Sequence, residues 1–266
     1  MRIRSFFEKE IVPLYQDYGF RYYHLASEEF RFSDPTDSIL VKYRFYKRNS
    51  PLFSNVPSEI NIALSLSFGH RRLNFYPDRL KGIEPGSFDY FCANDTEIQQ
   101  AFYHSTDQLL HVVLPRLFQL RDCFVPINPQ YYTMLANHPE EQARQFSAVH
   151  NRSMIYSSDN YDWATQWLYH EIPDDYVLRQ TAFEQKLDQI IQLTAFCGEM
   201  IRSRIPGEWS WIDAEPPIGR LFGLSFDPSA PEPGYNVLCF LMDYWNFAKD
   251  FHHCTLFLPK IQKMMV

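Results

Sequence analysis

Residues 94–122 read NDTEIQQAFYHSTDQLLHVVLPRLFQLRD and show the clearest helical pattern in the chain. Apolar residues recur there at spacings of three and four, which places them on one face of a helix. Asn94 can cap the first turn, and Glu97 can reach back to it as in a capping box. Pro115 lacks a backbone N–H, so a kink or break is expected there. We predict a buried helix that closes the first half of the chain.

The sequence before this helix alternates as an antiparallel sheet does. The cleanest case is residues 60–68, where Ile60, Ile62 and Leu64 alternate with smaller or polar side chains. Shorter alternating runs lie at residues 20–32, 41–45 and 73–75. Together these patterns predict an α+β fold, in which a meander of about four antiparallel strands is flanked by helices.

The sequence after this helix is mainly helical in pattern, and its charge differs from that of the first half. Residues 1–121 carry 15 Lys and Arg against 14 Asp and Glu, whereas residues 122–266 carry 10 against 18. Prolines and glycines recur over residues 205–234 and predict a Pro-rich loop, in which residues 218–226 are a candidate strand. We therefore predict two parts: a helix–sheet–helix unit over 1–121 and a mainly helical, acidic unit over 122–266.

The composition is that of a folded, intracellular protein. Apolar residues make up 45% of the 266 positions and aromatic residues 17%, which is too apolar for a disordered chain. No apolar run approaches the roughly 20 residues that span a bilayer, and Glu8 and Glu10 interrupt any signal peptide. The five cysteines are odd in number and never spaced as C-x-x-C, which predicts a reduced, cytoplasmic protein.

The Pro-rich stretch holds the residues that we single out as a candidate binding site. Trp209 and Trp211 are flanked there by Glu208 and Asp213. Large aromatic side chains are costly to expose and are enriched in binding hot spots. The alternative is that the two indoles pack beneath the stretch as part of the core.

A metal centre is a weaker interpretation of two His-containing patterns. His104, Asp107 and His111 share one face of the predicted central helix. Two residues seven positions apart lie about 10 Å apart along a helix, which is too far to chelate one ion. His252-His253-Cys254 are adjacent, and adjacent side chains diverge in regular structure. We expect no metal and no cofactor.

A basic, aromatic stretch raises the question of nucleic-acid binding. Lys42 and Arg44 alternate with Tyr43 and Phe45, and single-stranded nucleic acid is bound by such mixtures of stacking and charge. In a strand, however, alternation places these cations and these aromatics on opposite faces. The first half also lacks a net basic excess. We therefore expect a solvated face and no nucleic-acid partner.

The opening of the chain resembles a group of uncharacterised bacterial α+β domains of the kind found near toxin–immunity genes. The resemblance covers residues 1–121 and rests on Phe6, Phe7, Ile11, Leu14 and the pair Gly19-Phe20, before a strand rich in Tyr and Phe. It implies a first helix that ends in Gly-Phe and feeds an antiparallel sheet closed by a later helix. Independently of the resemblance, Pro13 predicts a kink or a restart within that first helix. An immunity or antitoxin-like role fits the acidic second half of the chain, because acidic surfaces steer basic partners to fast association.

The hypotheses that follow belong to two classes. The first is a non-catalytic protein that binds a basic protein partner through its acidic, aromatic-rich half. The second is a small-molecule-binding protein or hydrolase with a pocket between the two halves. No G-x-S-x-G, P-loop, G-x-G-x-x-G or H-E-x-x-H motif occurs in the sequence, which favours the first.

Overall fold

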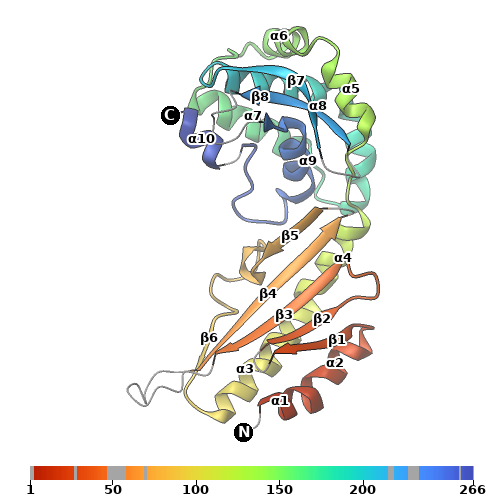
Figure 1. Ribbon diagram of the computed structural model, residues 1–266, viewed down its shortest axis with the longest axis vertical. Coiled ribbons are helices and arrows are strands. Elements are labelled where there is room, and N and C mark those ends of the chain that lie inside the picture. Colours follow the sequence, from red (N-terminus) through yellow and green to blue (C-terminus); the bar gives the residue numbers. More distant parts are fainter. Residues whose placement is uncertain are drawn as a thin grey trace. The chain divides into compact units, whose positions relative to one another are not determined.

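The antiparallel sheet lies in the first of two units into which the chain folds, Met1–Asp122 and Cys123–Val266 (Figure 1). A computed structural model describes residues 3–26, 29–46, 58–68, 71–214, 219–226, 234–257 and 259–265. The helical elements of the first unit are α1 Ile3–Phe6, η1 Phe7–Ile11, α2 Val12–Asp17, η2 Pro77–Arg79, α3 Asp95–Gln108, η3 Leu109–Val113 and α4 Leu114–Asp122. Its strands are β1 Arg21–Ala26, β2 Glu29–Ser33, β3 Ile39–Tyr46, β4 Ser58–Phe68, β5 Arg71–Phe75 and β6 Tyr90–Cys92.

The strands pair in chain order from β1 to β5, all antiparallel, and β6 pairs with the start of β4. The predicted antiparallel sheet with flanking helices is confirmed, with six strands where about four were expected. In the register, Tyr43 lies opposite Phe30 on one side and opposite Ile62 on the other. Apolar side chains therefore line a single face of the sheet, because side chains in a strand alternate between faces.

The helices α1–α4 pack on this apolar face (Figure 1), largely through aromatic rings. Phe7 stacks on Phe30 with ring centroids 4.1 Å apart, and Phe102 meets Phe7 edge-on at 5.1 Å. Such pairs contribute about 0.5–1.5 kcal/mol each beyond the area that they bury. The buried hydroxyl of Tyr43 is hydrogen-bonded to Thr106 Oγ1 at 2.9 Å, so the core leaves this polar group satisfied.

The segments α1–η1–α2 and α3–η3–α4 each contain a proline preceded by a π-helical turn. The turn η1 ends two residues before Pro13, and the turn η3 ends two residues before Pro115. At the second, the N–H of Leu114 bonds to the carbonyl of Leu109, which is the wide i→i+5 pattern of a π turn. The helix thus rearranges its hydrogen bonds next to a residue that cannot donate one, and it continues to Asp122.

The start of α3 bears the predicted cap. The N–H of Glu97 donates to Asn94 Oδ1 at 3.0 Å, and the Glu97 carboxylate accepts from the N–H of Ala93 at 2.7 Å. The carboxylate reaches one residue further back than in the expected capping box. The predicted helix over 94–122 is therefore present, and its π turn replaces the expected break.

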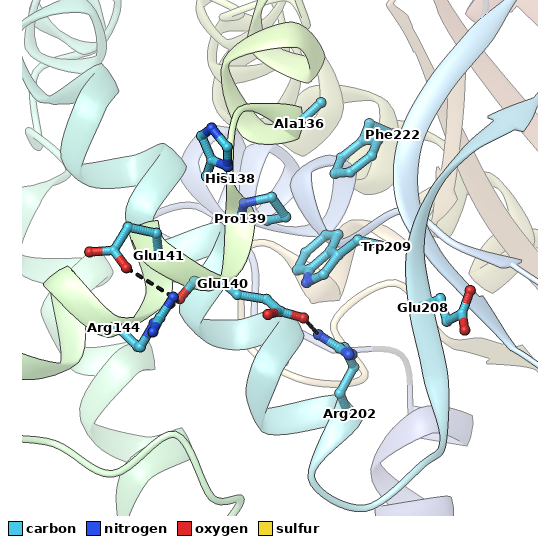
Figure 2. Close-up of a pocket in the computed structure, with 10 residues that line it drawn as sticks. All are labelled: Ala136, His138, Pro139, Glu140, Glu141, Arg144, Arg202, Glu208, Trp209 and Phe222. Carbon is cyan, nitrogen blue, oxygen red and sulfur yellow. Dashed lines mark hydrogen bonds and ion pairs between the residues drawn. The ribbon is translucent and has the colours of Figure 1, made fainter.

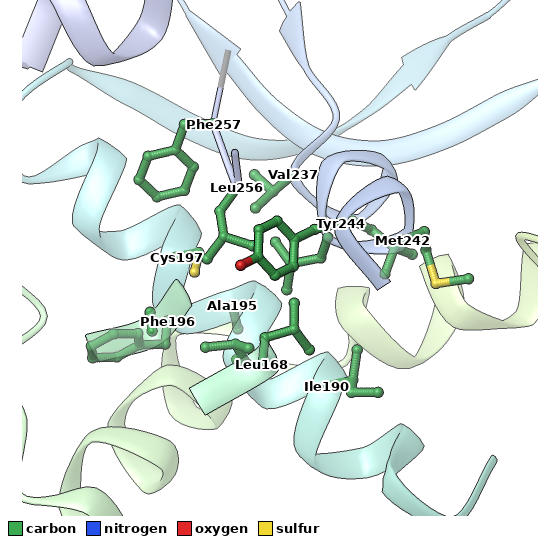
Figure 3. Packing of buried hydrophobic residues seen from close by; sticks show 14 of the residues in the cluster. Leu168, Ile190, Ala195, Phe196, Cys197, Val237, Met242, Tyr244, Leu256 and Phe257 are labelled. Carbon is green, nitrogen blue, oxygen red and sulfur yellow. The ribbon is translucent and has the colours of Figure 1, made fainter. Parts of the chain in front are cut away.

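The second unit is mainly helical and contains a small sheet. Its helical elements are α5 Pro129–Ala136, α6 Pro139–His150, α7 Ser158–Glu171, η4 Tyr176–Leu178, α8 Arg179–Arg202, α9 Val237–Phe247 and α10 Pro259–Met265. Its strands are β7 Gly207–Asp213, β8 Arg220–Phe226 and β9 Gly234–Tyr235. Helix α8 is largely buried over residues 190–201, and side chains from α7 and α9 meet it in the core that Figure 3 shows.

The prediction of a Pro-rich loop over 205–234 is wrong for residues 207–213, which form a strand paired antiparallel with residues 220–226, inside the candidate strand 218–226. Trp209 lies opposite Leu224, and Trp211 opposite Phe222. The cause is the alternation of large apolar side chains along both runs, which suits a pleated, half-buried strand better than a loop. Among the described residues, no helix is long and apolar enough to cross a membrane.

Candidate binding groove beside strand β7

Strand β7 is an edge strand of the small sheet. Of the described strands, only β8 pairs with it, so its other side presents backbone N–H and C=O groups that no other described strand takes up. One of these groups, the carbonyl of Gly207, accepts a hydrogen bond from Arg202 Nε at 3.0 Å. A free edge of this kind is a template for the addition of another strand.

A groove of about 620 Å³ lies between β7 and the start of α6 (Figure 2). His138, Pro139 and Glu140 line one side of it, and Trp209 and Glu208 line the other. Its volume falls within the roughly 300–1,000 Å³ of typical ligand sites. The groove therefore offers space for side chains directly beside a free strand edge.

Trp209 is held rigidly in the wall of this groove. Its indole N–H donates to Glu199 Oε1 at 2.7 Å, and its ring is parallel to Phe222 at a centroid distance of 5.7 Å. The ring lies over Gly198 of α8, where a Cβ would come within 2.1 Å of Cζ2. Only glycine leaves room for the indole at this point, so Trp209 fixes β7 against α8.

A chain of ion pairs connects the two walls. Arg202 Nη1 lies 2.7 Å from Glu199 Oε1 and 2.7 Å from Glu140 Oε1. The bond from Arg202 holds the pKa of Glu140 below its usual range, because the guanidinium favours the charged carboxylate. Burial alone would lower the pKa of Arg202, but its two carboxylate partners outweigh burial and raise it. These charges are already neutralised by one another.

Glu208 differs from the other acidic side chains of the groove. It is exposed, and it has no hydrogen bond or ion pair with another described residue. It also lines a second hollow at the end of α8, beside Ser203 and Pro206. Its carboxylate is thus the group of the groove that is available to a cationic partner.

Trp211 lies two residues beyond Trp209 on the same face of β7, and 40% of its surface is exposed. It meets Phe222 edge-on at 5.4 Å, and the Arg220 guanidinium lies 5.6 Å from its ring centroid. Asp213, at the end of the strand, lies 3.5 Å from Arg220 Nε in an exposed ion pair of little energetic weight. Neither Trp211 nor Asp213 lines the groove.

The four residues singled out from the sequence therefore divide into two groups. Glu208 and Trp209 lie at the groove, Trp211 extends the exposed aromatic surface beside it, and Asp213 engages Arg220. Sequence reasoning missed Glu140 and Arg202. The run His138-Pro139-Glu140 signals a helix start, which it is, but no local pattern shows that this start faces β7.

The two His-containing patterns singled out from the sequence form no metal site among the described residues. His104, Asp107 and His111 are exposed, and His111 Nδ1 lies 3.0 Å from Asp107 Oδ1. In the described part of the chain, no three His, Cys, Asp or Glu side chains are placed to hold a metal ion. Cys197 is fully buried, and burial raises the pKa of its thiol, which makes it a poor nucleophile.

Comparisons of the chain with protein-family models, with curated proteins and with solved structures gave no match. The groove itself is therefore the basis for a function. It combines an unpaired strand edge, a rigid aromatic wall and one unpaired carboxylate, which are features of binding.

Proposed function

We propose that this chain is a non-catalytic binding protein that captures an extended, basic segment of a protein partner along the free edge of β7. The observation that carries the proposal is the unpaired edge of β7, which lies directly against the groove. In strand addition, backbone hydrogen bonds supply affinity and side chains at alternate positions supply specificity. Both elements are present here, in one place.

The aromatic surface contributes the apolar part of the binding energy. Trp211 is 40% exposed, which for a side chain of about 250 Å² leaves on the order of 100 Å² to be covered. At about 25 cal/mol per Å², covering that surface contributes roughly 2.5 kcal/mol. Each added backbone hydrogen bond contributes about 0.5–1.5 kcal/mol more.

The charge of the second unit favours a basic partner. Residues 122–266 carry 18 Asp and Glu against 10 Lys and Arg, and such an excess steers oppositely charged proteins towards association. On the side of β7 away from Trp209 (Figure 2), Glu208 is a carboxylate available to a Lys or Arg of the bound segment. An immunity-like role against a basic toxin is the specific form of this proposal that the resemblance of residues 1–121 favours.

The strand geometry predicts the pattern of the bound segment. Glu208 and Trp211 are three residues apart, so their side chains point to opposite faces of β7. In an added strand, the residues opposite them are also three apart. The preferred segment therefore carries Lys or Arg at one position and a large apolar residue three positions away.

The test is selection from a displayed library of random peptides of about ten residues, with the full chain as bait. Enrichment of a basic and an apolar residue at that spacing is the expected result. In the Glu208→Lys variant, the basic preference should change to an acidic one. Asp188→Lys is the matched control, because Asp188 is exposed on α8 and does not line the groove. Peptides that lack the spacing, or that ignore the Glu208→Lys change, would refute the proposal.

A further inference from the structure

The first unit has a second surface that its apolar core does not use. The helices α1–α4 cover one face of the six-stranded sheet (Figure 1), and the opposite face bears partly exposed polar and charged side chains. Arg31, Lys42 and Arg44 all point to this opposite face, because Phe30, Tyr43 and their neighbours occupy the buried one. We name this surface the basic sheet face.

Two tyrosines share the basic sheet face with these cations. The register aligns Tyr23, Arg31 and Lys42 in one row across β1, β2 and β3, and adjacent strands lie about 4.8 Å apart. Tyr46 follows Lys42 by four residues along β3 and therefore points to the same side. Tyr23 is 43% exposed and Tyr46 44%. The rings of Tyr23 and Tyr46 thus lie on the same face as the cations, whereas Tyr43 and Phe45 lie on the buried face.

Positive charge on this face exceeds the carboxylates that could neutralise it. Among the described residues, Arg31, Lys42 and Arg44 share a single carboxylate partner, Glu29, with Arg44 Nε at 3.1 Å and Lys42 Nζ at 4.0 Å. Burial lowers the pKa of Lys42, and the charge of Arg31 lowers it further. The other charged groups that the structure describes on or beside this face are Arg21, Arg72, Asp37 and Glu59. Within that part of the chain, five cations accompany three carboxylates.

A hollow of about 340 Å³ lies on the same face. Tyr23, Arg31 and Arg72 line it, so one aromatic ring and two guanidinium groups meet at one concave place. Asp37 is also at its rim, but Arg21 Nη2 lies 2.7 Å from the Asp37 carboxylate and neutralises it. The hollow is large enough for a nucleotide, and guanidinium groups match phosphate oxygens in geometry.

We propose that the basic sheet face binds single-stranded nucleic acid, with bases stacked on Tyr23 and Tyr46 and phosphates held by Arg31, Lys42 and Arg72. Aromatic platforms within a cationic surface are the general means by which sheets bind single strands without reading their sequence. The proposal is independent of the groove beside β7, because it uses other residues in the other unit. It revises the sequence-based expectation that this surface is only solvated.

Fluorescence anisotropy of the full chain with a labelled oligothymidylate of about 12 nucleotides tests the proposal. Binding should weaken with salt, with a slope of log K against log salt of about −2 for three phosphate contacts at 0.7 each. Lys42→Gln and Arg72→Gln should each reduce the magnitude of the slope by about 0.7. Arg204→Gln, an exposed cation of the second unit, is the matched control and should leave the slope unchanged.

The tyrosines separate stacking from charge. Tyr23→Ala and Tyr46→Ala should each weaken binding roughly 5- to 150-fold, the range measured for one base stacked on an aromatic ring. Tyr23→Phe and Tyr46→Phe retain the ring and should bind as the parent does. Circular dichroism that matches the parent shows that each variant is folded. Equal affinity for duplex DNA, equal competition by thymidine monophosphate, or no binding at low salt would overturn the proposal.

Discussion

The substitution Gly198→Ala should destabilise the second unit, although alanine is the better helix former. Gly198 lies within α8, beneath the indole of Trp209. A Cβ at this position would come 2.1 Å from Cζ2 and 2.3 Å from Cη2 of that ring, so the indole has to leave its place. The substitution therefore has two opposing effects on stability: alanine favours the helix, and its methyl group displaces the indole of Trp209.

The structure allows the magnitude to be worked out. Displacing the indole breaks its hydrogen bond to the Glu199 carboxylate, a charge-assisted type that contributes about 1.5–3 kcal/mol. It also breaks the parallel contact with Phe222, which contributes about 0.5–1.5 kcal/mol. Replacing glycine by alanine within a helix stabilises the helix by about 1 kcal/mol, which offsets part of this loss. The net loss of unfolding free energy should be about 1–3.5 kcal/mol.

Urea unfolding followed by tryptophan fluorescence is a suitable assay, because all five tryptophans lie in residues 123–266. With a slope of about 2 kcal/mol per molar urea, the midpoint should fall by roughly 0.5–1.7 M. The sign should reverse when Trp209→Ala is already present, since no ring then opposes the new methyl group. In that background, Gly198→Ala should stabilise by about 1 kcal/mol.

The two backgrounds together make the reasoning refutable. If Gly198→Ala stabilises the protein that retains Trp209, helix propensity dominates and the close approach does not constrain the fold. If it destabilises both backgrounds equally, the loss arises elsewhere in α8 than at the indole. The packing of Trp209 over Gly198 is supported only if Gly198→Ala destabilises the protein that retains Trp209 and stabilises the protein that lacks it.

Two further substitutions probe the charges of the second unit. Arg179→Met should destabilise by about 3–5 kcal/mol in urea, because it removes the guanidinium 2.8 Å from Asp250 in a buried ion pair; a loss below about 1 kcal/mol would contradict this. Glu140→Gln tests pH dependence. The pKa of Glu140 is lowered in the folded state, so its bond with Arg202 stabilises the fold at pH values above about 4.3, which is the pKa of Glu in an unfolded chain. This stabilisation is lost as the pH falls through the lowered pKa of the folded state. The difference in urea midpoint between parent and Glu140→Gln should therefore be present at pH 7 and shrink as the pH is lowered below about 4.3, whereas a constant difference would refute the role of ionisation.

Much of the architecture follows from local patterns. The spacing of apolar residues over 94–122 and the cap at Asn94 predict a helix that the structure contains. The alternation over 60–68 predicts β4 and the apolar face that it presents. These predictions succeed because helix and strand periodicities are properties of consecutive residues. The effect of the two prolines was foreseen only as a disturbance, since the choice between a break and a π turn depends on the packing of the whole helix.

The surfaces proposed for binding depend on contacts between distant residues. Alternation shows that Lys42 points away from Tyr43, but only strand pairing places Tyr23 of β1 in its row. Prolines suggested a loop around Trp209, whereas pairing with β8 makes a strand and leaves its other edge free.

What the sequence determined by itself is therefore the class of fold, the closing helix and the set of side chains that are buried together. The tertiary structure alone decided that β7 lies at an edge, that α6 begins beside it, and that Gly198 makes room for Trp209. The physical reason is that periodicity is encoded in neighbouring residues, whereas strand order, register and close approach arise from hydrogen bonds and packing between segments far apart in the chain.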